Sequence, residues 1–332
     1  MKKLMNAPAD FVDEMLDGLT AAWPAAFVRD GESRRVIRRT DGARKGKVGV
    51  VSGGGSGHLP LFTGYVGKGL LDSCSIGNVF EGPTVDSCIE AIKLADGGAG
   101  VLRLYGNYGG DRMNFDMAGE FLEDEIKTTT VLGTDDIASA GPEESGKRRG
   151  VAGIIYAYKA AGAKAEDGAS LDAVTEIAQR TVDATRTIGV ALSPCQVPGA
   201  AQPSFTIGED EIEMGMGIHG EPGIWRDKLR PADAVADEMV QRLLADAPKG
   251  RGSRVSVLVN SLGATPLEEL LIVYRRVSAK LKGEGIEIVL PLVGHYATSM
   301  EMAGLSISLC VLDQEIEALL RKPAASPFWR VA

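Results

Sequence analysis

Short apolar runs rich in β-branched residues alternate along most of this chain with longer amphipathic segments. Residues 47–52 and 100–105 have the pattern of strands, and residues 86–95 between them have the apolar spacing of a helix. Glycine-rich loops join these segments. Strands that alternate with helices in this way are typical of βαβ units, in which helices cover a mainly parallel or mixed sheet. The chain is therefore expected to belong to the α/β class.

The alternation continues through the second half of the chain. Further helices are predicted over residues 113–126, 149–163, 171–184, 230–247 and 266–282, and further strands over residues 129–132, 211–218, 254–260, 286–290 and 306–311. A second strand-rich part begins near Thr187 and is interrupted by a proline-rich stretch. A length of 332 residues suits two medium α/β domains. We place the division near residue 185, which gives domains of residues 1–185 and 186–332.

Composition narrows the class of function. The chain is 44% hydrophobic and 24% charged, which is typical of a folded enzyme, and it carries a net charge of −9. An acidic balance argues against nucleic-acid binding, which needs clustered Lys and Arg. Two short basic runs, residues 147–149 and 249–254, stand beside glycines. We interpret them as solvated turns, so no nucleic-acid partner is predicted.

Cysteine usage and the first residues indicate the compartment. The four cysteines lie far apart in the sequence without CxxC spacing, so the pattern predicts neither a zinc site nor a redox motif. A reduced chain fits the cytoplasm best. The opening residues MKKLMNAP lack the apolar core of a signal peptide, and no apolar run has the length of a membrane span. We therefore predict a cytoplasmic protein with no bound metal and no membrane contact.

The first glycine-rich segment follows the strand predicted at residues 47–52. It reads GGGSGH over residues 53–58, with Leu59 and Pro60 next. Neither the GxGxxG fingerprint of dinucleotide sites nor the Gly-Lys-Ser/Thr of a P-loop fits it. A tight turn alone would need fewer glycines. We interpret the segment as a loop whose main-chain N–H groups approach a polar ligand, with His58 beside it.

A second glycine-rich loop, YGNYGGD over residues 105–111, follows the strand predicted to end near Leu104. In open α/β sheets the ligand site gathers at the carboxyl ends of the strands. Asp111 is therefore a candidate site residue. Asp is also a frequent helix N-cap, so the spacing leaves both roles open.

A third such segment, MGMGIHGEPG, covers residues 214–223. Alternate glycines weaken a strand and usually mark the close approach of a ligand or of another backbone. Of the three histidines, His58 and His219 stand in glycine-rich loops, whereas His295 is interpreted as an ordinary buried or partner-facing residue. His58 and His219 together with Asp111 form a candidate set for acid, base and nucleophile.

These segments together resemble the dihydroxyacetone kinase family, specifically its sugar-binding K subunit. The resemblance rests on GGGSGH at 53–58, GNVF at 77–80, NYGGDRMNF at 107–115, RRGVAG at 148–153 and GEDEIEMGMGIHGEPG at 208–223. LGATP at 262–266 and residues 294–309 extend it, so that the likeness covers nearly the whole chain.

The resemblance implies two α/β domains in a homodimer and a role for each candidate. The histidine that matches His219 would form a hemiaminal with the C2 carbonyl of a small ketose. His58 and Asp111 would handle the proton of the terminal hydroxyl, while Gly55, Ser56 and Gly57 would hydrogen-bond the sugar. A covalent bond suits a very small polar ketone, which offers little apolar surface to bury.

The resemblance also implies that the phosphoryl donor is held elsewhere. In this family the nucleotide site lies in a separate all-helical domain or subunit, so ATP or ADP with Mg is expected on a partner and no cofactor on this chain. The chain departs from the family pattern at Leu59, where a Glu is common, and at Gly106, where a Lys that contacts the substrate is usual. The ketose is therefore left open between dihydroxyacetone and a four-carbon sugar such as erythrulose.

Two alternatives from other classes remain. A non-catalytic ketose sensor would keep His219 and would not need His58 or Asp111. A lyase or aldolase would need a Schiff-base lysine or metal ligands, and the glycine-rich loops contain neither. The sequence therefore favours a kinase subunit and keeps the sensor as its competitor.

Overall fold

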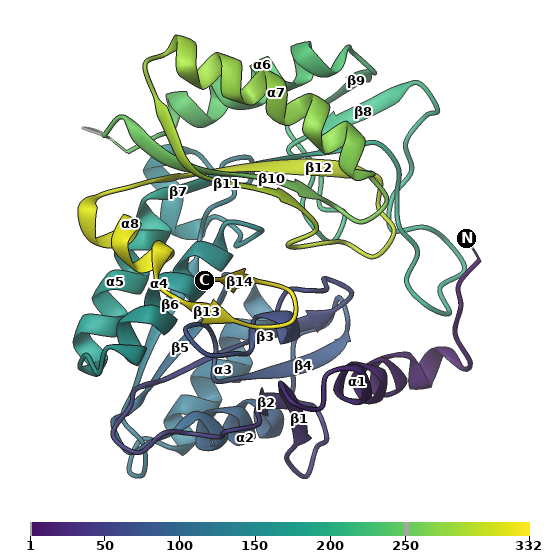
Figure 1. Cartoon of the computed structure of the whole chain (residues 1–332). Coiled ribbons are helices and arrows are strands. Elements are labelled where there is room, and N and C mark those ends of the chain that lie inside the picture. The colour runs from purple at the N-terminus through teal and green to yellow at the C-terminus, as the bar shows by residue number, and fades with distance from the viewer. Residues whose placement is uncertain (1, 249–251) are drawn as a thin grey trace. The chain divides into compact units, whose positions relative to one another are not determined.

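The computed structural model describes residues 2–248 and 252–332 (Figure 1). Contacts within the chain group it into two compact units. The N-terminal unit comprises residues 2–133, 155–181 and 316–332, and the C-terminal unit comprises residues 134–154 and 182–315 apart from the gap at 249–251. The division near residue 185 stays a prediction.

The N-terminal unit is a six-stranded sheet with helices packed on it. Its helices are η1 (Pro8–Asp10), α1 (Phe11–Ala22), η2 (Thr63–Tyr65), α2 (Val85–Ala95), α3 (Gly109–Phe121), α4 (Ile154–Glu166), α5 (Leu171–Asp183) and α8 (Gln314–Arg321). Its strands are β1 (Phe27–Asp30), β2 (Val36–Arg39), β3 (Gly49–Ser56), β4 (Ser73–Val79), β5 (Val101–Gly106) and β6 (Thr128–Gly133), with a small hairpin of β13 (Ala324–Ala325) and β14 (Arg330–Val331).

The strand order of this sheet is β1-β2-β4-β3-β5-β6. Strands β4, β3, β5 and β6 are parallel to one another. Strand β2 pairs antiparallel with both β4 and β1, which forms the edge. Helices α2 and α3 cover one face with a core that includes Cys88, Ile92 and Phe115. On β3 the Ser52 hydroxyl lies 2.8 Å from the Tyr158 hydroxyl of α4. The parallel strands therefore end side by side, at the edge where ligands bind in such sheets.

The glycine run at 53–55 is part of β3, so the prediction that the strand ends at residue 52 is wrong. These glycines pair in parallel with β4, Gly53 opposite Ser75 and Gly55 opposite Gly77. A Cβ atom on Gly54 would lie 2.3 Å from the ring of Phe62. This close packing is possible only because the glycines at these positions have no side chains. Part of the glycine signal therefore comes from packing.

The C-terminal unit has a second six-stranded sheet. Its elements are η3 (Pro142–Lys147), β7 (Thr185–Ala191), β8 (Glu211–Met214), β9 (Trp225–Lys228), α6 (Ala232–Ala245), β10 (Arg254–Ser261), α7 (Leu267–Gly283), β11 (Glu287–Gly294) and β12 (Gly304–Val311). The order is β11-β10-β12-β7-β8-β9, in which only the β10–β11 pair is parallel. Helices α6 and α7 pack on one face (Figure 1). The predicted α/β class with mixed sheets and flanking helices is confirmed.

Several element boundaries differ from those predicted. The strand predicted at 211–218 ends at Met214, because Gly215 adopts a positive φ of 83° that extended residues do not share. Helix α3 begins at Gly109, four residues before its predicted start, and α4 begins at Ile154, five residues after its own. Elements α1, β1, β2, β4, β9 and α8 were not predicted.

The basic run at 147–149 is not a fully solvated turn. The Arg148 side chain is 1% exposed and donates two hydrogen bonds, of 2.7 and 2.6 Å, to Asp246. Arg149 donates to Asp136. Of the second run, residues 249–251 lie outside the described residues, and Arg254 pairs with Glu287.

Among the described residues no helix combines the length and apolar character needed to span a membrane.

Candidate functional site

The glycine-rich loops of the N-terminal unit lie at the carboxyl ends of neighbouring parallel strands. Ser56 ends β3 and its carbonyl accepts a 3.0 Å hydrogen bond from the Phe80 N–H, just after β4. A Cβ on Gly55 would lie 2.9 Å from Phe80 backbone atoms. Gly106 ends β5, which pairs with β3 on the other side. The strand order therefore gathers the predicted Gly55, Ser56 and Gly106 at one edge of the sheet.

His58 is packed beside this edge. It is 1% exposed, stacks on the Phe80 ring with centroids 5.0 Å apart, and meets Phe62 edge-on at 6.4 Å. Gly57 before it has a φ of 101°, a backbone conformation that favours glycine. Phe80 itself has a φ of 62°, which is unusual for a bulky residue and tends to occur at functional sites. The imidazole plane is thus fixed by aromatic contacts that the sequence did not reveal.

Asp111 lies in the first turn of α3 and is 8% exposed. The N-cap of the helix is Tyr108, so Asp111 does not occupy the capping position that was one of its two predicted roles. A Cβ on Gly82 would lie 2.8 Å from the Asp111 Oδ1 atom. The Asn114 side chain donates to the Pro83 carbonyl at 2.6 Å and ties α3 to the same loop. The loop after β4 thus contacts His58 through Phe80 and lies against Asp111 at Gly82.

His219 belongs to the C-terminal unit and lies in a turn after β8. The turn is closed by hydrogen bonds of 3.0 Å from the Gly217 N–H to the Glu221 carbonyl and 3.1 Å from the Gly220 N–H to the Gly217 carbonyl. Gly220 has a φ of 86°, so glycine suits that place. Ser299 donates to the Ile218 carbonyl from a neighbouring loop. The backbone that carries His219 is therefore fixed on both sides.

Glu221 holds the ring of His219. Its Oε1 atom lies 2.9 Å from the imidazole Nδ1, and its Oε2 atom accepts a 2.9 Å hydrogen bond from the His219 N–H. Burial opposes ionisation, but the hydrogen bond from His219 and the charges of His219 and Arg149 outweigh it and lower the pKa of Glu221 to about 2. Glu221 is thus a carboxylate at neutral pH, which can only accept a hydrogen bond. In the neutral form of the ring, the imidazole proton therefore resides on Nδ1.

Two further charges continue this line of contacts. The Arg149 Nη1 atom lies 3.7 Å from Glu221 Oε2, and Arg149 donates to Asp136 at 2.9 Å. Asp136 is 3% exposed, and burial raises its pKa to about 6 despite the neighbouring Arg149 charge. We call His219, Glu221, Arg149 and Asp136 the histidine charge chain. In the sequence, Glu221 and Arg149 are only letters of the segments 208–223 and 148–153, because their contacts depend on the turn and on tertiary packing.

His295 is exposed, and its Nε2 atom lies 3.2 Å from the Gly263 carbonyl. The interpretation of His295 as a buried residue is therefore wrong, and the interpretation as a partner-facing residue stays a prediction. Within the described residues no group of three or more His, Cys, Asp or Glu side chains is arranged to hold a metal ion.

Comparison with known proteins defines the class. The Dak1 domain model matches residues 17–328. The chain is 44% identical, over 99% of its length and all of the relative, to the PTS-dependent dihydroxyacetone kinase 1, dihydroxyacetone-binding subunit DhaK of Listeria innocua. It is also 44% identical, over 99% of its length, to the L-erythrulose kinase of Pectobacterium atrosepticum, of which it covers 56%. The chain belongs to the Dak1 domain family, and the predicted relationship to dihydroxyacetone kinases is confirmed.

Solved structures agree with this placement. The crystal structure of the dihydroxyacetone kinase of C. freundii superposes with a TM-score of 0.90 at 33% identity, covering 99% of this chain and 60% of that one. The structure titled dihydroxyacetone kinase operon co-activator Dha-DhaQ gives a TM-score of 0.88 at 33% identity, covering 95% and 97%. The same fold therefore occurs in a kinase and in a protein named for gene activation.

Proposed function

We propose that this chain is the substrate-binding subunit of a dihydroxyacetone-type kinase. It holds a small ketose as a hemiaminal on His219 and presents the terminal hydroxyl to a phosphoryl group carried by a separate nucleotide-binding subunit. The full-length match to a relative named as a dihydroxyacetone-binding subunit supports the class of reaction. The pairing of His219 Nδ1 with Glu221 is the observation that carries the covalent step.

The pairing prepares His219 as a nucleophile. With its proton on Nδ1, the ring offers the Nε2 lone pair to the C2 carbonyl of the ketose. A C–N bond forms, the C=O π bond breaks, and the carbonyl oxygen takes up a proton. The ring carries positive charge until its Nδ1 proton leaves for solvent, and the ionised Glu221 stabilises that charge. The product is a neutral hemiaminal. In reverse, the imidazole takes up a proton on Nδ1, the hemiaminal hydroxyl loses its proton, the C–N bond breaks, and the C=O bond forms again.

His58 and Asp111 act on the hydroxyl that attacks phosphorus. Both side chains are almost fully buried, His58 at 1% and Asp111 at 8% exposure, which strengthens their interaction with a bound polar group. His58 or Asp111 accepts the hydroxyl proton as the O–P bond forms. Gly55, Ser56 and Gly57 bind the sugar through backbone groups and the Ser56 hydroxyl, and Gly106 borders it.

The donor comes from another protein. A helical nucleotide-carrying subunit holds ATP or ADP with Mg, and this chain binds no cofactor. The resemblance to the dihydroxyacetone kinase family supports a homodimer, and the four free cysteines support action in the cytoplasm. The covered share of the L-erythrulose kinase, 56%, is consistent with a second functional part in that longer relative.

Intact-mass measurement with dihydroxyacetone, followed by phosphorylation assays with and without the partner subunit, tests the proposal. The wild type, His58→Asn and Asp111→Asn should all form the adduct, whereas only the wild type should turn over, and only with the partner. His219→Ala should lose both adduct and turnover, and His295→Ala, at an exposed histidine, should lose neither. Equal ketose binding by His219→Ala and the wild type would reject the covalent step.

A ketose sensor is the second candidate, and the similarity to a protein titled operon co-activator favours it specifically. A sensor would form the same adduct on His219 without phosphorylating the sugar. Turnover by the wild type with a nucleotide-carrying partner, abolished in Asp111→Asn, decides for the kinase. An adduct without turnover with any nucleotide-carrying subunit decides for the sensor.

A further inference from the structure

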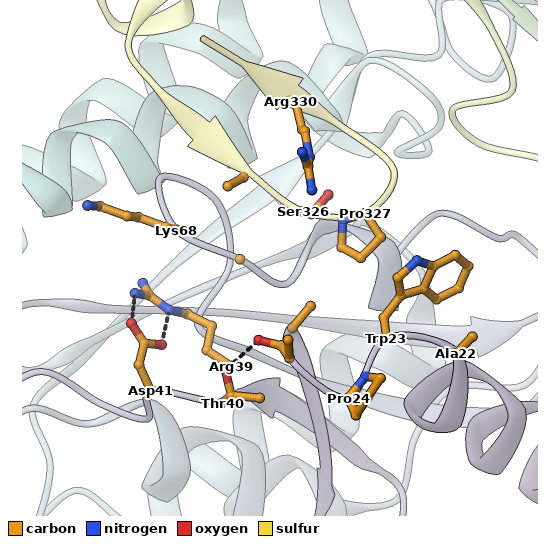
Figure 2. A pocket seen from close by; sticks show the side chains of 14 residues that line it. Ala22, Trp23, Pro24, Arg39, Thr40, Asp41, Lys68, Ser326, Pro327 and Arg330 are labelled. Atoms are coloured by element: carbon orange, nitrogen blue, oxygen red, sulfur yellow. Dashed lines mark hydrogen bonds and ion pairs between the residues drawn. The ribbon is translucent and has the colours of Figure 1, made fainter.

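A cavity of about 500 Å³ lies in the N-terminal unit, outside the glycine-rich loops (Figure 2). Its walls come from residues 22–26 at and after the end of α1, residues 39–41 at the end of β2, Gly67 with Lys68, and residues 325–327 with Arg330 of the C-terminal hairpin. This volume falls in the range of small-molecule sites. The proposed ketose chemistry uses none of these residues.

The walls of the cavity are well fixed. Lys68 forms a β-bridge with Ala325, whose N–H donates to the Lys68 carbonyl at 2.9 Å. A Cβ on Gly67 would lie 2.2 Å from the Ala325 carbonyl oxygen, so glycine is needed at this contact. Trp23 packs edge-on against Phe328, with ring centroids 4.9 Å apart. The small alanines around Trp23 leave the space open, and the packed backbone keeps it in shape.

The charged side chains that line the cavity without forming an ion pair in the described ranges are positive. Arg39 donates to both oxygens of Asp41 at 2.8 and 2.6 Å, and it also contacts Asp72 and Glu166, so its charge is balanced from within. Lys68 and Arg330 are exposed, and neither forms an ion pair with a residue in the described ranges. The pocket thus places two cations on a chain whose net charge is −9.

The apolar part of the lining is aromatic. Trp23 is 39% exposed and borders the cavity together with Pro24 and Pro327. In Figure 2 Lys68 and Trp23 lie on opposite sides, the Lys68 ammonium points away from Trp23, and Arg330 extends downward from the hairpin above. An indole face and two prolines favour a flat apolar group, whereas Lys and Arg favour a phosphate.

We infer that this cavity, which we call the Trp23 pocket, binds a small phosphate monoester with a planar apolar body. Lys68 pairs with Ala325, and Ala325 pairs with Arg330, so the two cations stand on alternate strands of one small sheet. The phosphate would contact Arg330, the flexible Lys68 side chain would turn toward it, and the planar body would lie against Trp23. The dianionic charge of such an ester matches the two available cations. A sugar without charge or apolar surface would gain little there.

Calorimetric titration with phenyl phosphate tests the inference, since this probe joins one phosphate to one flat ring. We expect a single site that is weakened about tenfold in Lys68→Gln and in Arg330→Gln, because each loses a charge-assisted hydrogen bond. Lys282→Gln removes an exposed lysine of α7 in the other unit and should bind as the wild type does. Trp23→Leu should weaken binding about threefold to tenfold.

Inorganic phosphate and phenol separate the two halves of the ligand. Each should bind more weakly than phenyl phosphate. Phosphate that binds as tightly as phenyl phosphate, with Trp23→Leu unaffected, would overturn the planar part of the inference. Absence of saturable binding to the wild type, or equal binding by Lys68→Gln, Arg330→Gln and Lys282→Gln, would overturn the site as a whole. Both cation variants change exposed side chains, so they should fold normally.

Discussion

The carboxylate of Glu221 binds His219 twice, at the ring Nδ1 and at the backbone N–H, each at 2.9 Å. A side chain two residues away can do this only because the turn from Gly217 to Glu221 folds back on itself. The same carboxylate fixes the tautomer and the orientation of the ring. In many enzyme sites a neighbouring carboxylate orients a nucleophilic or metal-binding histidine in this way.

Replacement of Glu221 by Gln tests this arrangement. The amide keeps the size and a hydrogen-bond acceptor but loses the negative charge that stabilises the positive ring, so we expect adduct formation and kcat/KM for the ketose to fall about 10- to 100-fold. Glu209→Gln, at an exposed glutamate of the same segment, is the matched control and should behave as the wild type. Intact-mass titration and steady-state assays report the two quantities. Adduct formation unchanged in Glu221→Gln would show that the charge is dispensable.

The histidine charge chain also predicts a pH dependence of stability. The pKa of Asp136 is raised by burial to about 6 in the folded chain, from 3.8 when unfolded. Between these values the folded state holds a proton that the unfolded state has released. The contribution of Asp136 is therefore fully present below pH 3.8 and is lost as the pH rises through 6.

Asp136→Asn removes this contribution. Relative to the variant, the wild type should lose on the order of 3 kcal/mol of unfolding free energy between pH 4 and pH 7, since one pKa unit corresponds to about 1.4 kcal/mol. Urea unfolding at several pH values measures the difference. Asp210→Asn, at an exposed aspartate, should follow the wild type throughout. Parallel curves for wild type and Asp136→Asn would contradict the assignment.

The glycine run in β3 predicts a stability effect that separates packing from ligand binding. Gly54→Ala places a methyl group 2.3 Å from the Phe62 ring and should destabilise the fold by about 1 to 3 kcal/mol. Gly18→Ala lies in α1 with no atom within 4 Å of the added carbon, and should stabilise by about 0.5 to 1 kcal/mol. Denaturant unfolding of both variants gives the comparison.

The double variant Gly54→Ala with Phe62→Leu checks the cause. Removal of the ring should make the two substitutions less costly together than their separate effects predict, because they act at one contact. Additive costs would indicate that the alanine disturbs the strand in some other way.

Much of the fold can be predicted from the sequence pattern alone. The elements that were predicted wrongly share one cause. The helix at 86–95 and the strand at 254–260 were predicted to within one residue of α2 and β10, because apolar periodicity dominates there. Gly53 to Gly55 were assigned to a loop, since glycine is disfavoured in strands. The packing of Phe62 and Phe115 rings against that strand is a tertiary contact with no local signal.

The candidate site divides in the same way. Histidines inside glycine-rich segments were visible in the sequence, and the structure places His58 beside the carboxyl edge of the first sheet and His219 in a fixed turn. Phe80 and Arg149 could not be recognised, because each meets its histidine or carboxylate across many residues of sequence. Only the geometry of the turn shows that Glu221 binds His219.

The final prediction concerns which ketose is phosphorylated. Gly106 ends β5 at the edge that carries Ser56, and Leu59 follows His58 directly. The family pattern has a lysine and a glutamate at these two places. If both side chains approach the site, their joint loss leaves no buried charge uncompensated, and it removes the long lysine stem from this edge. The chain is 44% identical both to a relative named as a dihydroxyacetone-binding subunit and to one named as an L-erythrulose kinase, so overall identity does not decide the sugar.

We predict that erythrulose is accepted at least as well as dihydroxyacetone, since the space without the lysine can admit one more hydroxymethyl group. If that group forms its hydrogen bonds, it is worth roughly 1 to 3 kcal/mol in kcat/KM. The decisive measurement is kcat/KM for both sugars in the wild type and in Gly106→Lys, with the partner subunit present. Gly106→Lys should shift the preference toward dihydroxyacetone, and Gly109→Lys, at an exposed glycine with open space around it, should shift it less. A wild-type preference for dihydroxyacetone of about tenfold or more that persists unchanged in Gly106→Lys would show that other side chains or ordered water occupy the space.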